Sequence, residues 1–308
     1  MPAVESFDVV IIGGGAAGVS CSLELKDNLV RHALLERSQE LGGQLSQIHT
    51  PIKNLGIGQF ANGTALQNQL IKSANERNLP FRLNDEVIAV NLSQKTVKTR
   101  HGSLIGKALV LATGARMRRI EIEEGAHLAE QILYRLEDKE SKFEGKSAIV
   151  IGGDELAVLE ALWFAKNAPK CVLVCHSDKL QAGNDLVKEA KTNKRLEILL
   201  SSEIRELMGK DKIEAVRVFN HRTQEMRRIP IPLVVAKIGM VPNTELFTGQ
   251  LDLAANGCIK TNVLAQTSLP GIFAVGDVAF PSYWRLSTAI GQGTVAARAA
   301  MEYLAKLN

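Results

Sequence analysis

The chain contains little cysteine: four residues in 308, namely Cys21, Cys171, Cys175 and Cys258, with no Cys-x-x-Cys among them. A disulfide scaffold carries many more, so that class is excluded. Cys171 and Cys175 lie in one apolar segment, and in a strand their Cα atoms would be ~13 Å apart. A disulfide needs roughly 4.4–6.8 Å. We therefore expect all four to be structural, and the sequence leaves open only a redox pair of cysteines distant in the chain.

The chain also lacks a strong charge bias and a long apolar run. Its formal net charge of +4 is too small to favour nucleic acid or a membrane surface as a partner. No apolar run approaches the ~18 residues that span a bilayer. Glu5 and Asp8 precede the first apolar run, which argues against a signal peptide. We therefore expect a cytoplasmic protein without a transmembrane segment. The histidines show no metal-ligand spacing, so no metal site is predicted.

The most informative segment runs from Phe7 to Gly18 and reads FDVVIIGGGAAG. A short apolar strand leads into Gly-x-Gly-x-x-Gly at Gly13, Gly15 and Gly18, and a helix follows. Gly13 permits a tight turn, Gly15 lets the backbone approach a pyrophosphate, and Gly18 lets the helix pack on the sheet. The helix N-terminus faces the negative charge. Glu36 ends the next apolar run, where an acid bonds the ribose of an adenosine, so the segment predicts a dinucleotide site.

A second copy of this pattern begins at Ser147 and predicts a second α/β unit, followed by a hinge at 238–243. The copy comprises a strand with glycines at 147–153, a helix at 154–167 and a buried strand at 171–175. Further strands are expected at 86–90, 95–99, 103–108, 109–115, 196–200, 213–219, 226–229, 233–238 and 272–277, and residues 41–54 are expected to be a loop. Helices are expected at 65–78 and 287–307, the last with Ile290, Val295, Ala299 and Leu304 inward.

Four motifs occur in a fixed order: Gly13 to Gly18, Gly43-Gln44-Leu45, Ala112-Thr113-Gly114-Ala115, and Gly-Ile-Phe-Ala-Val-Gly-Asp at 271–277. Together they resemble the low-molecular-weight thioredoxin reductase family over nearly the whole chain. The resemblance implies an α/β fold with two Rossmann-like, three-layer nucleotide-binding domains. It places a discontinuous FAD-binding domain at 1–116 and 239–308 and an inserted NAD(P)-domain-like unit at 117–238. It also implies a homodimer.

The resemblance also assigns residues to the cofactor. The residues that it places around FAD are Gly13, Gly15, Gly18, Glu36, Arg37, Gly43, Gln44, Leu45, Asn54, Val87, Ala112, Thr113, Gly114, Gly276, Asp277, Arg285, Leu286 and Ala289. Leu286 stands where the family has a glutamine. The adjacent aromatics Tyr283 and Trp284 either stack on a flavin or a second ligand, or pack in the dimer interface. No catalytic residue is identified.

Three departures separate the chain from the thioredoxin-reducing members of the family. Their Cys-x-x-Cys is absent from residues 126–134. The second glycine motif reads Gly152-Gly153-Asp154-Glu155, and an acid there repels a pyrophosphate. The family's His-Arg-Arg, which holds the 2′-phosphate of NADPH, reads His176-Ser177-Asp178. We therefore expect poor NADPH recognition and no reduction of thioredoxin by the usual route.

These departures favour an FAD oxidoreductase with altered electron entry. The branch that the chain most resembles is the diflavin-linked disulfide oxidoreductase, in which a second FAD occupies the NADPH cleft. Here that cleft would be formed by Gly152, Gly153, Asp154 and Glu155. The expected partner is a small redox protein or a thiol/disulfide. Two alternatives stay open: an NAD(P)H- or ferredoxin-linked flavin reductase, and a non-catalytic flavin-binding scaffold or redox sensor.

Overall fold

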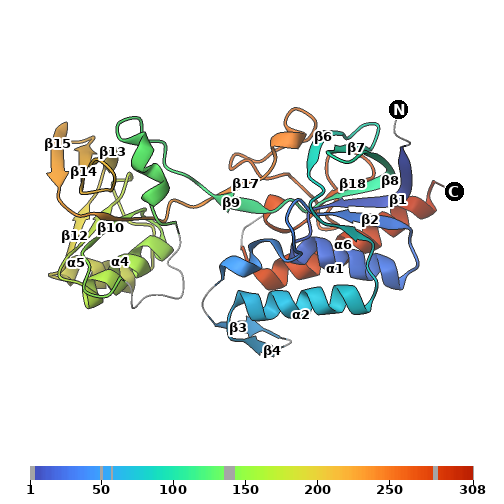
Figure 1. Cartoon of the computed structure of the whole chain (residues 1–308), viewed down its shortest axis with the longest axis horizontal. Helices are drawn as coiled ribbons and strands as arrows, with labels where there is room; N and C mark the ends of the chain where they lie inside the picture. The colour runs from blue at the N-terminus through green and yellow to red at the C-terminus, as the bar shows by residue number, and fades with distance from the viewer. Residues whose placement is uncertain (1–3, 49–50, 57, 135–142, 280–283, 308) are drawn as a thin grey trace. The chain divides into compact units, whose positions relative to one another are not determined.

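The computed structural model describes residues 4–48, 51–56, 58–134, 143–279 and 284–307, and the chain divides into two compact units (Figure 1). Unit 1 comprises residues 1–116 and 241–308, and unit 2 comprises residues 117–240. The chain passes between the units in β9 (Ala115–Met117) and β17 (Met240–Pro242), and these two strands pair with each other. The second boundary therefore lies after residue 240 rather than after 238.

Unit 1 is built on one sheet with strand order β5-β2-β1-β8-β7-β6, and β18 also pairs with β8. All neighbours pair in parallel except β6 with β7 and β7 with β8. The strands are β1 (Glu5–Ile12), β2 (His32–Leu35), β5 (Phe81–Arg82), β6 (Val87–Asn91), β7 (Thr96–Thr99), β8 (Ser103–Leu111) and β18 (Ile272–Ala274). Helices α1 (Ala16–Asp27), α2 (Gly63–Glu76) and α6 (Leu286–Ala305) cover one face (Figure 1).

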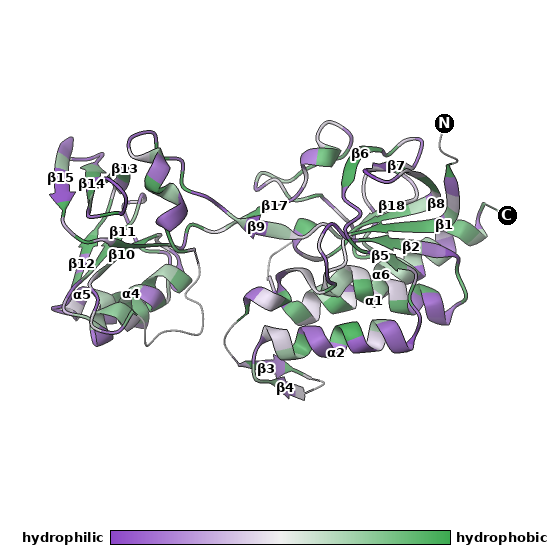
Figure 2. Ribbon diagram, in the orientation of Figure 1, coloured by the Kyte–Doolittle hydropathy of each residue, from purple (hydrophilic) through white to green (hydrophobic). Residues whose placement is uncertain are grey.

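The core of unit 1 follows the alternation of side chains along β1. Val9 and Ile11 pack with residues of α1 and α6, whereas Val10 and Ile12 pack on the opposite face with Phe247. Because both faces of the central strands are covered, these strands are almost continuously apolar, and Figure 2 shows them as hydrophobic. The carboxyl end of β1 thus lies inside a three-layered unit.

Strand β8 is one strand where the sequence predicted two, at 103–108 and 109–115. Its first half alternates between exposed and buried residues and pairs with antiparallel β7. Its second half, Ala108 to Leu111, is fully buried between β1 and β18. The pattern of alternately exposed and buried side chains changes to continuous burial within one strand. The prediction placed a boundary between two strands at that point.

Helix α6 packs on α1 through small residues. Its buried face consists of Gly293, Ala296, Ala297, Ala299 and Ala300. Of the four residues predicted to point inward, Ala299 belongs to this face and the half-buried Leu304 packs against the same core, whereas Ile290 and Val295 are half-buried outside it. A Cβ on Gly293 would lie 2.2 Å from the carbonyl oxygen of Ala17, so the two helices meet backbone to backbone. Larger inward side chains would hold them apart.

Unit 2 contains a parallel sheet with order β12-β11-β10-β16 and a separate antiparallel sheet, β13-β14-β15. The parallel strands are β10 (Ala148–Ile151), β11 (Cys171–Val174), β12 (Leu196–Leu199) and β16 (Leu233–Ala236). The antiparallel strands are β13 (Ser202–Met208), which was not predicted, β14 (Ala215–Asn220) and β15 (Glu225–Ile229). Helices α4 (Glu155–Asn167) and α5 (Asn184–Thr192) pack on one face of the parallel sheet, and the antiparallel sheet packs on the other.

Short elements complete the fold. They are the hairpin β3 (Ile52–Leu55) and β4 (Gly58–Phe60), which replaces part of the loop predicted at 41–54, and the 3₁₀ turns η1 (Gly43–Gln47), η2 (Ala126–Gln131), η3 (Glu245–Phe247) and η4 (Gly276–Val278). Within the described ranges, no helix combines the length and the apolar character needed to cross a bilayer.

Candidate functional site

The turn between β1 and α1 leaves an open helix N-terminus. Gly13 has φ +112°, and a Cβ there would lie 2.3 Å from the carbonyl oxygen of Ala112. A Cβ on Gly18 would lie 1.9 Å from the carbonyl oxygen of Gly13, so the helix presses against the turn. Gly15, the N-cap of α1, has no side-chain cap, and a Cβ there would meet nothing within 4 Å. Unsatisfied N–H groups beside open space form a binding site for an anion.

Glu36 lies beside this turn and is already oriented. Its carboxylate is 6% exposed and accepts hydrogen bonds from the backbone N–H of Gly14, at 2.7 Å, and of Ser38, at 2.8 Å. A carboxylate has about four acceptor positions, so these two bonds leave capacity for ligand hydroxyls.

A second loop and the end of β18 meet this turn. A Cβ on Gly43 would lie 3.2 Å from the Cα of Gly15, so the two loops are in contact. The side-chain amide of Gln44 donates a 2.8 Å hydrogen bond to Asp277 Oδ2. Burial raises the pKa of the Asp277 carboxyl, and the bond from Gln44 opposes that shift. Gly276, with φ +71°, brings this segment against Ala17 and Ala289, the latter in the first turn of α6.

Asn243 fixes the end of β8 and was not predicted to have a structural role in the site. Its side-chain amide donates to the carbonyl oxygen of Thr113, and its own carbonyl accepts from the Thr113 hydroxyl, both at 2.8 Å. The N–H of Asn243 also donates to the carbonyl of Gly114. The sequence indicated only a hinge here, because this pairing joins residues 130 positions apart.

The other residues predicted around FAD are spread over unit 1. Ala112 is buried below the turn, whereas Leu45 is buried in a small apolar cluster against which Leu286 packs. Arg37 follows β2 and is exposed, Asn54 is exposed on β3, Val87 begins β6, and Arg285 is the exposed N-cap of α6. The structure therefore brings together the glycine loops with Gln44 and Asp277, and it leaves Arg37, Asn54 and Arg285 at the surface.

Trp284 contributes an unsatisfied donor. Its indole Nε1 is buried and has no hydrogen-bond partner in the parts of the chain that the structure describes. A buried indole N–H normally finds an acceptor. Its neighbour Tyr283 lies outside the described residues.

The corresponding turn in unit 2 differs at one decisive position. Gly152, with φ +145°, repeats the packing of Gly13, since a Cβ there would lie 2.1 Å from the carbonyl oxygen of Lys237. Asp154 is the N-cap of α4, as Gly15 is of α1. Its carboxylate accepts a 2.9 Å hydrogen bond from the N–H of Ala157. A negative side chain thus occupies the N-terminus where the first unit presents free N–H groups.

A cavity of about 420 Å³ lies beside this capped turn. Gly152, Gly153 and Asp154 line it, whereas Glu155 is exposed outside it. Glu121 and Glu203 add two further acids to the lining. The lysine of the lining, Lys237, is already engaged: its Nζ lies 3.6 Å from Glu160 and donates to the carbonyl of Tyr134 at 3.4 Å. The cavity walls are therefore poor in free positive charge.

All four cysteines are free and buried. Burial raises the pKa of each thiol, that of Cys171 to about 12. A thiol that stays protonated is a weak nucleophile. The expectation that the cysteines are structural agrees with this burial.

The sequence missed one group of side chains. His176, Glu203 and His221 lie together in unit 2, although their spacing in the chain predicted no metal site. They come from the ends of different strands, so only the tertiary structure brings them into contact.

The chain resembles known proteins over nearly its full length. A family model described as pyridine nucleotide-disulphide oxidoreductase matches residues 7–300. A 34.2 kDa protein in the rubredoxin operon of Clostridium pasteurianum is 31% identical, covering 97% of this chain and 98% of its own. A thioredoxin reductase of Streptomyces coelicolor is 30% identical, covering 98% and 95%.

A solved structure shares the architecture. The thioredoxin reductase of Lactococcus lactis superposes with a TM-score of 0.81 at 27% identity, covering 97% of this chain and 99% of that chain. Members of the matched family typically bind FAD. The chain therefore belongs to the pyridine nucleotide-disulphide oxidoreductase family and is an oxidoreductase of the low-molecular-weight thioredoxin reductase type.

Proposed function

We propose that unit 1 binds FAD and that unit 2 has lost the family's usual mode of NADPH binding, so that electrons enter the enzyme by another route. One observation carries this proposal: the contrast between two helix N-termini. Gly15 leaves that of α1 open, and Asp154 closes that of α4 with a carboxylate. The first attracts a pyrophosphate, whereas the second repels one.

The residues of unit 1 fit FAD. The open space beside Gly15 admits the pyrophosphate, and Glu36 faces the same turn with acceptor capacity for ribose hydroxyls. The Gln44–Asp277 pair offers a polar anchor for the chain between ring and phosphates, and Trp284 Nε1 supplies a buried donor. When bound, FAD would supply the electron transfer, and these residues would position it. Arg37, Asn54, Val87 and Arg285 remain proposed contacts, supported by the family resemblance.

We propose a second FAD as the ligand of the cavity in unit 2. A volume of about 420 Å³ suits part of a cofactor, and Gly152 preserves the turn that shapes a dinucleotide cleft. Asp154 disfavours a pyrophosphate at the α4 N-terminus. Stacking of the second flavin ring on the first therefore has to supply much of the affinity for the second FAD. Electrons would then pass between flavins without a nicotinamide.

The proposed electron acceptor is a disulfide of a small redox protein or of a small thiol. Curated relatives are named thioredoxin reductase, which motivates this substrate class. Because the thiols of this chain are all buried, the partner's disulfide would have to meet the flavin of unit 1 without a thiol relay.

Substitution of Asp154 tests the loss of NADPH binding. Asp154→Asn keeps a capping side chain without its charge. Asp154→Gly gives α4 the same N-cap residue as α1 and lowers the stability of the protein by a few tenths of a kcal/mol. Removal of the repulsion between a carboxylate and a pyrophosphate is worth about 3 kcal/mol at the effective dielectric of a protein surface, roughly a hundredfold in Kd. Both variants should therefore show stronger NADPH-dependent bleaching of the flavin, with Glu155→Gln as the control. Equal bleaching in wild type and all variants would contradict the role of Asp154.

The flavin content tests the second FAD, and the response to nicotinamide nucleotides tests the altered electron entry. Denatured protein should release about two FAD per chain, and anaerobic mixing of the wild type with NADH or NADPH should leave the flavin oxidised. One FAD per chain with rapid bleaching by either nucleotide would refute the second flavin and favour a nucleotide-linked flavin reductase. One FAD that no donor reduces would favour a flavin-binding scaffold.

A further inference from the structure

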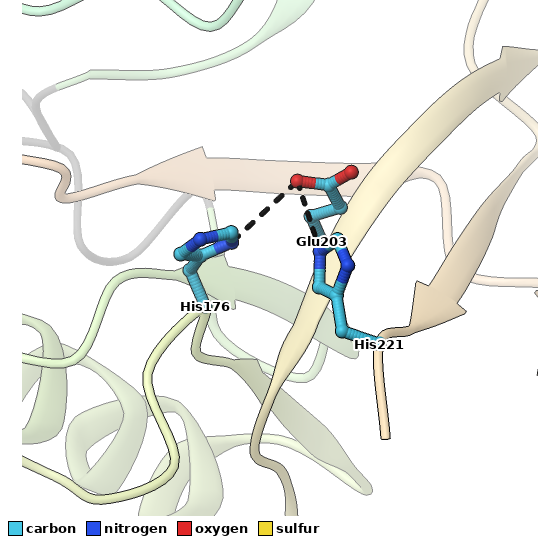
Figure 3. Close-up of side chains that lie close together, drawn as sticks. All are labelled: His176, Glu203 and His221. Carbon is cyan, nitrogen blue, oxygen red and sulfur yellow. Dashed lines mark ion pairs between the residues drawn. The ribbon is translucent and has the colours of Figure 1, made fainter. Parts of the chain in front are cut away.

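Three side chains of unit 2 converge from different strands (Figure 3). His176 follows β11 by two residues, Glu203 lies on β13, and His221 directly follows β14. Figure 3 shows both imidazole rings directed toward the carboxylate of Glu203. Among the described residues, no other group of three or more histidine, cysteine, aspartate or glutamate side chains lies this close together.

The separations of the donor atoms match those around a small divalent cation. Glu203 Oε2 lies 3.5 Å from Nδ1 of His176 and 3.3 Å from Nε2 of His221. All three donor atoms lie within 4.8 Å of one another. Tetrahedral ligands with bonds of about 2.0–2.2 Å are about 3.4 Å apart, so two of the three edges already have the right length. The side chain of His176 is 74% exposed, so its ring has room to move and to adjust the third edge, which joins the two histidine nitrogens.

His221 points to a missing partner. Its Nε2 is buried and makes no hydrogen bond to any described residue, because the contact with Glu203 lacks hydrogen-bond geometry. The residue itself is held in place: its N–H donates to the carbonyl of Ser201 at 2.7 Å, and its ring forms a T-shaped pair with that of Phe219, with the centroids 5.1 Å apart. A fixed imidazole with an unsatisfied buried nitrogen is suited to a metal ion.

Arg205 orients the carboxylate. Its guanidinium lies 2.5 Å from the other oxygen of Glu203, Oε1, and over the ring of Phe219 at 5.4 Å. Glu203 Oε2 therefore remains available to the histidines. Arg205 acts here as outer-shell residues do when they orient a metal ligand. The positive charge of Arg205 also opposes a bound cation, so the site should favour cations that bind imidazole strongly over hard cations.

We propose that His176, Glu203 and His221 bind a divalent transition-metal ion of the zinc class. Two imidazoles and one carboxylate form a set of three protein ligands, which leaves a fourth position open. His176 and Glu203 also line the cavity beside Asp154, so the fourth position faces that cavity. The site requires no flavin and stands independently of the function proposed above.

Titration of the tag-free, EDTA-treated and dialysed full chain with Zn²⁺ tests this site. We expect one saturable site per chain by isothermal titration calorimetry, a Zn²⁺-dependent rise in Tm and no rise with Mg²⁺. Co²⁺ should give the visible spectrum of a four-coordinate site, a readout that wild-type protein provides on its own. No saturable Zn²⁺ binding at one equivalent, and no Co²⁺ spectrum, would overturn the proposal.

Variants locate the ion. His221→Gln and Glu203→Gln should each weaken Zn²⁺ binding at least tenfold. His127→Gln is the matched control, because His127 is an exposed histidine of the same unit whose side chain bonds the carbonyl of Lys210. Unchanged affinity in both site variants, or an equal loss in the control, would place the ion elsewhere. Circular dichroism checks that each variant is folded.

Discussion

Gly15 and Gly18 belong to one motif but have different surroundings. A Cβ at Gly15 would meet no atom within 4 Å, whereas a Cβ at Gly18 would lie 1.9 Å from a backbone oxygen. One position is open toward a ligand, and the other is closed by packing. Substitutions at the two positions should therefore separate loss of binding from loss of folding.

We expect Gly15→Asp to fold and to lose FAD. A carboxylate beside a pyrophosphate costs about 3 kcal/mol at the effective dielectric of a protein surface, roughly a hundredfold in Kd. The flavin absorbance per chain after purification and gel filtration measures the loss. Gly15→Ala places an uncharged methyl group in the same space, so it should lose less flavin than Gly15→Asp. A Gly15→Asp protein with full flavin content would contradict the site.

Gly18→Ala provides the opposite comparison. The added methyl group overpacks the turn, which typically costs 1–3 kcal/mol of stability or more. Its Tm without added FAD should fall well below that of Gly15→Asp. Equal Tm values for the two variants would contradict the close packing assigned to Gly18.

The local residues were predictable, and those that meet across the fold were not. Gly13, Gly15, Gly18 and Glu36 form a motif whose spacing carries its own chemistry. Asp154 was predicted to disturb the second motif, but its role as a helix cap requires the hydrogen bond to Ala157. The partners of Asn243 and the meeting of His176 with His221 depend on strand ends that no local pattern encodes.

At the scale of elements, Glu197 links the two sheets of unit 2. Hydrogen bonds from Arg227 on β15, and to a smaller extent from Lys170, hold the pKa of Glu197 on β12 at about 2, although burial acts to raise it. Because the folded-state pKa is lowered, the ionised carboxylate stabilises the fold above the unfolded pKa. That contribution is lost as the pH falls toward 2.

We expect Glu197→Gln to lose about 1 kcal/mol or less at pH 7, since Arg227 is half exposed. The difference in unfolding free energy between wild type and variant should shrink between about pH 4.5 and pH 2. Urea unfolding over this pH range measures it. Glu225→Gln, an exposed acid on β15, is the control. A difference between wild type and Glu197→Gln that grows on acidification would contradict the assigned sign.

Elements with one environment were easier to predict than elements with two. The helix after each glycine turn and the buried strands β1, β10 and β11 each match a single sequence pattern over their whole length, and they were predicted. Strand β8 passes from an alternating to a buried environment, and β13 carries three charged residues, so neither matches a single pattern. The fully buried face of α6 is made of alanine and glycine, whereas the prediction favoured larger side chains, of which Leu304 packs against the core.

For the whole molecule, the family resemblance predicts a homodimer, and light scattering of the holoprotein should give the mass of two chains. The buried face of α6 does not supply the interface, because it packs on α1 within unit 1. Only monomer across the micromolar range would refute the dimer. A dimer that persists after flavin removal would show that its interface forms without the cofactor.

The backbone contact between α6 and α1 also sets the order in which the protein can mature on the ribosome. Unit 2 is continuous in sequence and can fold as soon as residue 240 has been made. Unit 1 folds later, because β18, Asp277 and α6 are synthesised last and the turn at residue 13 packs against them. Until then the second half of β8 is paired with β1 on one edge only, and the edge that β18 covers is unpaired. We therefore expect flavin binding to follow the synthesis of α6, so that a chain terminated before α6 would carry a folded unit 2 but remain colourless.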